Sequence, residues 1–231
     1  MGNEIGLPND ANGDSSNINF ELNQGVLSRL EGLDPGVAGI RISETNWVDG
    51  AGQAIAHSTC LKRLCLWIRH RESYDFMIRQ LCNEWLPRNR SIETFSILDG
   101  PSPSGGGTIS FSFLTPFFEN NDNLRCIQLS NIVHMKPWDI EPIVRALSAC
   151  KKNQLERIEI QGVRGTDEER AEFFTLLTSA QQGLLELHIT NFFDDQRGAP
   201  TKMAYDDSPP SLKILHPNFK RCELTKMMFW I

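Results

Sequence analysis

The chain has 231 residues, of which 40% are hydrophobic and 23% are charged, a composition typical of a folded globular protein. Its formal net charge is −6, and its basic residues are scattered along the sequence. This distribution argues against a nucleic-acid-binding protein, which would carry a concentrated basic surface. No apolar run approaches the ~20 residues of a membrane-spanning helix, so we expect no membrane partner.

The N-terminal segment differs in composition from the rest of the chain. Residues 1–17 are polar and rich in Asn, Gly, Ser and Asp, so we expect a disordered tail there. We expect residues 18–34 to form an N-terminal cap on whatever follows. The polar start does not resemble a signal peptide, and the six cysteines include no C-x-x-C pair. We therefore expect reduced thiols and a cytoplasmic protein, with the nucleus left open.

One short pattern, apolar-x-x-apolar-x-apolar, recurs along most of the sequence. The good copies are VAGIRI from Val37, LKRLCL from Leu61, IETFSI from Ile92, LRCIQL from Leu124, LERIEI from Leu155 and LLELHI from Leu184. A weaker seventh copy, SLKILHP, offers Leu212 and Leu215. Successive first positions are 24, 31, 32, 31, 29 and 28 residues apart. Because alternating apolar residues are typical of a half-buried strand, each copy predicts one strand.

The intervals between these copies carry a helical period instead. Apolar residues within 74–85 share one helix face, and Pro87 is expected to end that helix. Residues 140–150 show the same spacing, with Asp139 as the expected N-cap. The capping box Thr166–Glu169 predicts a third helix, whose apolar stripe includes Phe173. The repeating unit is thus a strand and a helix in about thirty residues, and stacked units would bury a continuous core.

These copies resemble the leucine-rich repeat family, whose consensus L-x-x-L-x-L-x-x-N they match at the first three apolar positions. The long period and the helical segments are similar to the ribonuclease-inhibitor-like branch of that family. In the segment 40–64, Asn46, Val48 and Gly52 stand near where that branch has Asn, Leu and Gly. The consensus Asn position is degenerate elsewhere, with Arg69 and Gly100 as examples, so we expect less regular turns.

The resemblance implies an architecture as well as a family. It implies an α/β leucine-rich repeat solenoid, a horseshoe arc with a parallel sheet on its concave side and helices on its convex side. The repeat domain would span residues 35–217 in six to seven repeats, and residues 218–231 would form a C-terminal tail. This tail ends in the apolar run Met227–Ile231, which leaves open whether it covers the last repeat or mediates self-association.

The segment GPSPSGGGT, residues 100–108, comes close to a phosphate-binding P-loop. A P-loop requires Lys and then Ser or Thr after its second glycine, but Gly106 and Gly107 occupy those places. The alternating run ISFSF that follows does not predict the helix that such a loop precedes. We therefore expect a flexible insertion and no nucleotide or other cofactor.

Other patterns that indicate catalysis are also missing from the sequence. Neither H-E-x-x-H nor G-x-S-x-G occurs. The adjacent carboxylates Asp194–Asp195 and Asp206–Asp207 fall in loop-like segments, so solvated charges are favoured over a metal site. We expect a protein with no catalytic residues and no metal, and not an enzyme.

In such a solenoid the residues between the apolar strand positions face the concave side and form three rows across the strands. The candidate partner-binding residues in these rows are Arg41, Arg63, Trp67, Leu98, Gln128, Arg157, Glu159 and His188. The leading hypothesis is a non-catalytic module that binds a protein partner there. The alternative is a regulatory subunit, such as a ubiquitin-ligase substrate adaptor or a GTPase regulator, as known leucine-rich repeat proteins imply. The sequence leaves open whether Trp67 and Leu98 bind a partner or only pack.

Overall fold

The computed structural model of the chain describes residues 20–43, 45–68, 78–99, 111–131, 138–151, 154–165, 167–181, 184–194 and 221–225. Within these residues nine strands form one sheet, in the order β1-β2-β3-β4-β5-β7-β8-β9, and β6 pairs with β7 off this path. All of the strand pairs are parallel. No helix in this part of the chain combines the length and the apolar composition needed to cross a membrane.

The strands and helices alternate along the chain, as the repeat predicts. The strands are β1 (Phe20–Glu21), β2 (Gly39–Ser43), β3 (Arg63–Ile68), β4 (Thr94–Asp99), β5 (Cys126–Asn131), β6 (Trp138–Asp139), β7 (Arg157–Gly165), β8 (Glu186–Asp194) and β9 (Arg221–Thr225). The helical segments are α1 (Gln24–Glu31), α2 (Ala51–His57), a π-helical turn (Leu81–Trp85), a 3-10 turn (Leu86–Arg88), a second 3-10 turn (Phe111–Leu114), α4 (Thr115–Asn120), α5 (Ile140–Ser148) and α6 (Asp167–Ala180).

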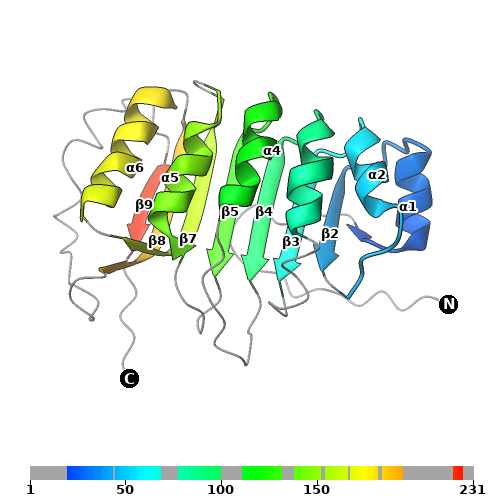
Figure 1. The fold of residues 1–231 in the computed structure, drawn as a ribbon, viewed down its shortest axis with the longest axis horizontal. Coiled ribbons are helices and arrows are strands. Elements are labelled where there is room, and N and C mark those ends of the chain that lie inside the picture. Colours follow the sequence, from blue (N-terminus) through cyan, green and yellow to red (C-terminus); the bar gives the residue numbers. More distant parts are fainter. Residues whose placement is uncertain are drawn as a thin grey trace.

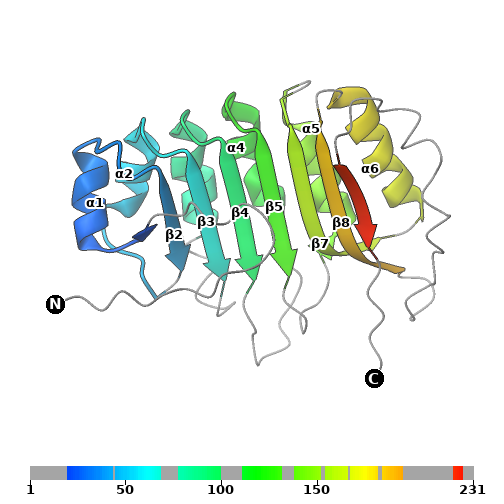
Figure 2. The same ribbon diagram turned by 180° about the vertical axis from the view of Figure 1, so that it is seen from behind.

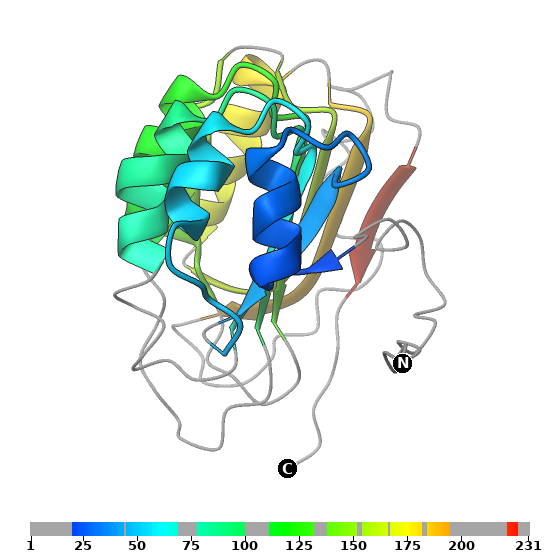
Figure 3. The same cartoon turned by 90° about the vertical axis from the view of Figure 1, so that its right-hand side faces the viewer.

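The helices form one layer against one side of the sheet. Figure 1 shows them in front of the strands, Figure 2 shows the sheet from the opposite side, and the end-on view in Figure 3 separates the two layers. This is the α/β leucine-rich repeat solenoid that the sequence predicts, with the sheet on one side and the helices on the other. Because parallel strands need a crossover between them, each helix connects one strand to the next.

The core lies between the two layers and is built from the repeated apolar positions. At the first, fourth and sixth position of each of the six copies, every described side chain is at most 2% exposed. Aromatic side chains fill the centre, where the rings of Phe95 and Phe117 lie 5.2 Å apart and those of Phe117 and Phe118 lie 5.6 Å apart. Burial of a Leu, Ile or Phe side chain contributes about 1.5–3 kcal/mol, so these positions account for much of the stability.

The helix predictions are confirmed at α5 and at the start of α6. Helix α5 begins at Ile140, directly after Asp139, and buries Ile143 and Leu147. Helix α6 begins at Asp167, and its Phe173 is 1% exposed. Residues 74–77 lie outside the described part of the chain. The expectation that Pro87 ends the helix predicted within 74–85 is wrong, because Pro87 lies within the 3-10 turn Leu86–Arg88. A proline fits the first turn of a helix, where the N–H groups have no intrahelical acceptor.

One helix contradicts the expectation drawn from the run ISFSF. Residues 111–114 form a 3-10 turn that continues into α4, so a helical segment does follow the glycine-rich residues. The spacing of Phe113, Leu114, Phe117 and Phe118 places these buried side chains on one helix face, and it overrides the short alternation. Residues 100–110, the P-loop-like segment, lie outside the described residues. The missing lysine remains the argument against a nucleotide site.

The sheet begins earlier than the first copy of the pattern. Strand β1 pairs with β2 in the register Phe20↔Ile40 and Glu21↔Arg41. Helix α1 follows it and is N-capped by Asn23, whose Oδ1 accepts the backbone N–H of Val26 at 3.0 Å. Residues 18–34, predicted to be a cap, therefore contain a strand and a helix of the same kind as the repeats, and the tail expected at 1–17 lies outside the described residues.

The seventh copy was assigned to the wrong residues. The strand that pairs with β8 is β9, with Cys222 opposite Leu187 and Leu224 opposite Ile189. Its copy of the pattern is therefore FKRCEL, and Leu212 and Leu215 lie outside the described residues. The prediction that 218–231 is a tail beyond the repeats is wrong at 221–225. A cysteine at the central apolar position weakens the pattern in the sequence, although its side chain is apolar enough for such a position.

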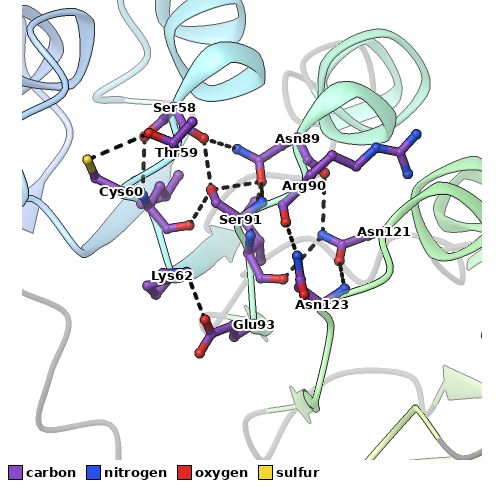
Figure 4. A network of polar contacts seen from close by, with 12 residues as sticks. Ser58, Thr59, Cys60, Lys62, Asn89, Arg90, Ser91, Glu93, Asn121 and Asn123 are labelled. Carbon is purple, nitrogen blue, oxygen red and sulfur yellow. Dashed lines mark hydrogen bonds and ion pairs between the residues drawn. The ribbon is translucent and has the colours of Figure 1, made fainter.

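A series of buried polar side chains joins the repeats where each helix returns to the next strand (Figure 4). The Nδ2 atom of Asn89 donates to the carbonyl oxygens of Ile55 at 2.6 Å and of Ser58 at 3.0 Å. Its Oδ1 atom accepts the backbone N–H groups of Ser91 and Ile92. Further along the solenoid, this kind of bond to the neighbouring repeat recurs at Asn121, Gln154 and Gln181. Buried backbone groups need such partners, so this ladder fixes one repeat against the next.

At the opposite end of the strands, the side chain of Asn46 bonds backbone groups at the turn that follows β2. Its Oδ1 accepts the N–H of Ser43 at 2.6 Å, and its Nδ2 donates to the carbonyl oxygen of Arg41 at 3.3 Å. Asn46 lies one residue beyond the consensus position, which is held by Thr45. The turn after β2 is therefore satisfied by a shifted asparagine.

Candidate protein-binding face

We call the side of the sheet opposite the helices the sheet face (Figure 2). The candidate residues alternate along the strands with the buried core positions, which assigns them to this face. The strand register confirms the predicted neighbours along the middle row. The middle row runs through the register partners Arg41, Cys65, Ser96, Gln128, Glu159 and His188. Trp67 is likewise the register partner of Leu98, so the two belong to neighbouring strands, and both side chains are partly exposed.

Arg41 and Trp67 form a contact between β2 and β3. The guanidinium carbon of Arg41 lies 5.3 Å from the centroid of the Trp67 ring. Such a cation–π contact contributes about 0.5–2 kcal/mol, depending on how far the pair is removed from water. It fixes a charged side chain over an aromatic surface at one end of the sheet face.

Cys65 is the register partner of Arg41, and its side chain is 0% exposed. Burial raises the pKa of Cys65 to about 11, although a hydrogen bond and the charge of Arg41 act in the opposite direction. The thiol is therefore protonated at neutral pH, and only a thiolate acts as a nucleophile. This arrangement favours a structural role for Cys65 rather than a catalytic one.

Arg41 and Arg63 differ from Arg157 on β7 in their ion pairs. The buried Nε–H groups of Arg41 and Arg63 donate no hydrogen bond among the residues that the structure describes. Neither guanidinium forms an ion pair in the described part of the chain, even though Glu21 is the register partner of Arg41. By contrast, Arg157 on β7 is paired with Glu159, with Nη2 and Oε2 3.2 Å apart.

The other half of the sheet face carries a connected chain of polar groups. Ser96 donates from Oγ to Oε1 of Gln128 at 2.7 Å, and Gln128 donates from Nε2 to Oε2 of Glu159 at 3.2 Å. Arg157 then joins Glu159 to Glu186, because its Nε lies 3.5 Å from the Glu186 Oε2 atom. This chain crosses β4, β5, β7 and β8 and keeps its side chains in defined positions.

The structure thus divides the predicted residues into two groups. Arg41, Arg63, Trp67 and Leu98 gather over β2, β3 and β4, while Gln128, Arg157 and Glu159 belong to the polar chain. His188 is the register partner of Glu159, but its side chain lies outside what the structure describes. Sequence reasoning did not select Ser96 and Glu186 as candidates, although Ser96 stands in the middle row and Glu186 is the register partner of Arg157. Only the hydrogen-bond geometry distinguishes them from their neighbours.

Among the described residues, no three His, Cys, Asp or Glu side chains gather into a group that could bind a metal ion.

The sequence matches no protein-family model and no curated protein. Among solved structures, the chain is similar to the tropomodulin C-terminal domain from Caenorhabditis elegans, at 12% sequence identity and a TM-score of 0.45. That similarity covers 66% of this chain and 89% of that one. The fold assignment here rests on the strand register and the repeated core.

Proposed function

We propose that the protein is a non-catalytic interaction module that binds a protein partner on its sheet face. The observation that carries the proposal is the cluster of Arg41, Arg63, Trp67 and Leu98 on that face. Trp and Arg dominate the residues that determine affinity at protein interfaces. The middle row runs over six neighbouring strands, from β2 to β8. At a spacing of about 4.8 Å these strands give a surface roughly 24 Å across, which accommodates a helix or an extended segment of a partner.

We also propose that the chain belongs with the ribonuclease-inhibitor-like branch of the leucine-rich repeat proteins. The support is the helical segments that connect the described strands from β1 to β8, together with the turn formed by Asn46. A cytoplasmic location, with the nucleus left open, remains a proposal, and its support is that the five cysteines assigned among the described residues are free thiols. The neutral thiol of Cys65 is consistent with the absence of catalysis that we propose.

Site-specific photo-crosslinking in cells tests the binding surface. A photoreactive amino acid would replace Thr94 or Gln128 on the sheet face, and in matched controls Gln53 or Glu119 on the exposed surface of the helices. We expect the sheet-face positions to crosslink to one protein and the helix positions to give no such product. Crosslinks to that protein from the helix positions alone, or from no position, would contradict the proposed surface.

Trp67→Ala then separates binding from packing once the crosslinked partner is identified. We expect its affinity for the partner to fall by about tenfold or more, which corresponds to roughly 1.4 kcal/mol, with an unchanged melting temperature. A lower melting temperature with unchanged affinity of the folded fraction would instead show that Trp67 is a packing residue.

A further inference from the structure

We propose that the partner segment is acidic where it crosses β2 and β3. Its carboxylates bind Arg41 and Arg63, and an apolar side chain next to them packs on Trp67 and Leu98. The inference rests on the proposed function, since it specifies the chemistry of the segment that docks on the same face.

The first argument is charge complementarity. This is an acidic protein with 29 acidic and 23 basic residues, so carboxylates for ion pairing are in excess. Cations elsewhere in the repeats use them: Lys62 pairs with Glu93 at 2.8 Å, and Lys151 pairs with Asp122 at 2.6 Å. Arg41 and Arg63 lie on neighbouring strands and have no such partner among the described residues. A guanidinium offers five N–H donors in a fixed fork that fits a carboxylate.

The second argument is that the cationic group is already positioned. Arg41 lies over the Trp67 ring and contacts the Cys65 thiol, so its guanidinium does not have to be ordered when a ligand binds. Preorganised side chains lose less conformational entropy on binding and therefore support tighter complexes. The pairing of Trp67 with Leu98 in the strand register places an apolar surface next to this charge.

The third argument is the opposite charge at the other end of the face. Two carboxylates, Glu159 and Glu186, lie at this end of the face, and both pair with Arg157. Strand β7 lies three strands beyond β3, which is about 14 Å at ~4.8 Å per strand. An acidic segment would be repelled there, so its carboxylates are confined to the β2–β3 end. The partner segment is then neutral or basic about 14 Å further along.

The same pattern favours a protein segment over a nucleic acid. A nucleic acid carries phosphate charges along its whole length, and those near β7 and β8 would face Glu159 and Glu186. A polypeptide can place its carboxylates at one end only. The occupant is therefore an acidic peptide segment with an adjacent apolar residue.

Selection from a library of random 16-residue peptides displayed on phage tests this inference on the full chain. We expect the selected peptides to carry an excess of Asp and Glu next to an aromatic or aliphatic residue. Their affinity should fall at least tenfold on Arg63→Ala and on Arg41→Ala, and it should fall as the salt concentration rises. Arg145→Ala is the matched control, because Arg145 lies on the exposed surface of α5, and it should leave the affinity unchanged.

Because Arg41 contacts the buried Cys65, Arg41→Ala is also expected to lower stability. Arg41→Lys keeps the positive charge and is expected to recover part of the lost affinity. If the role of Arg41 were purely structural, the affinity of the folded fraction would be the same for Arg41→Ala, Arg41→Lys and the parent. Neutral or basic selected peptides, no selected peptide, or equal affinity for Arg63→Ala and the parent would each overturn the inference. So would tight binding of a random 20-nucleotide single-stranded RNA that depends on Arg63.

The proposed function itself can fail separately. Crosslinks from Thr94 and Gln128 to a partner whose contacting segment is not acidic would retain the sheet face as a binding surface and overturn only the acidic segment. If neither position gave a crosslink, the sheet face would not be the binding surface, and the proposed function would be contradicted.

Discussion

Gly52 in α2 and Trp85 in the π-helical turn fit together with no room for another atom. A Cβ atom on Gly52 would lie 2.5 Å from Cδ1 and 2.7 Å from Cε2 of the Trp85 indole. The family resemblance already implied a glycine near this position, and the indole now gives its physical reason. The turn that carries Trp85 belongs to the next repeat, so this contact joins two neighbouring units.

We predict that Gly52→Ala destabilises the protein by about 1–3 kcal/mol, because the added methyl group overpacks the contact with Trp85. The sign is informative, since the same substitution in an unobstructed helix stabilises it by up to about 1 kcal/mol. Chemical denaturation of the two proteins measures the difference. Gln53→Ala, at an exposed position of the same helix, is the control and should change stability by less than about 0.5 kcal/mol. A higher melting temperature for Gly52→Ala would contradict the close contact.

The repeated core was predictable from the sequence because burial requires apolar residues at a fixed spacing. Ile158 and Ile160 alternate around Glu159, and this alternation gives both the strand and the side chain that faces away from the core. Once the copies are aligned, the strand register follows, which is why Trp67 and Leu98 could be placed next to each other. The candidate rows were thus predictable as positions.

Features that depend on single side chains were not predictable. The ladder through Asn89 and Gln154 consists of buried polar residues, which a hydrophobic period does not detect. The Arg41–Trp67 contact and the bond between Ser96 and Gln128 depend on rotamers. Strand β9 was misplaced because Cys222 weakens its copy of the pattern, whereas Leu212 and Leu215 imitate that pattern.

Asn89→Ala is expected to lower the free energy of unfolding by about 2–4 kcal/mol. The substitution removes the donor for the Ile55 and Ser58 carbonyl oxygens and the acceptor for two backbone N–H groups. Asn89 is 0% exposed, so water does not replace these bonds, and each buried group left without a partner costs about 1–3 kcal/mol. Urea denaturation measures the loss. Asn83→Ala is the matched control at an exposed position, and an equally small effect at both positions would show that the ladder contributes little.

Two truncations test whether β9 belongs to the folded domain. A chain that ends after residue 217 lacks β9, leaving β8 with an unpaired edge along the five register pairs from Glu186 to Thr190. Unpaired edges favour association with other strands. We expect this chain to melt at a lower temperature and to self-associate in light scattering. A chain that ends after residue 225 keeps the strand and should behave like the parent. Equal behaviour of the two truncations would contradict a structural role for β9.

The buried thiols predict a loss of stability at alkaline pH. Burial raises the pKa of Cys150 to about 12 and that of Cys65 to about 11, from the ordinary value of 9.0. Burial likewise raises the pKa of Cys82. Above pH 9.0 the unfolded chain releases these protons while the folded chain keeps them. Stability is therefore fully present below that pH and is lost as the pH rises toward the folded pKa values, with a limiting slope of about 1.4 kcal/mol per pH unit for each thiol.

Cys150→Ala isolates one of these thiols from the lysines and tyrosines that also titrate in this range. The substitution is expected to reduce the slope of the free energy of unfolding between about pH 9.5 and 11 by close to one proton, which is ~1.4 kcal/mol per pH unit. Urea denaturation at several pH values measures the slope of each variant. Cys60→Ala is the control, because Cys60 is partly exposed and lies at a turn outside the core. An identical slope for Cys150→Ala and the parent would show that the Cys150 thiol ionises in the folded protein as readily as in the unfolded chain, and that α5 does not exclude water from this end of the core.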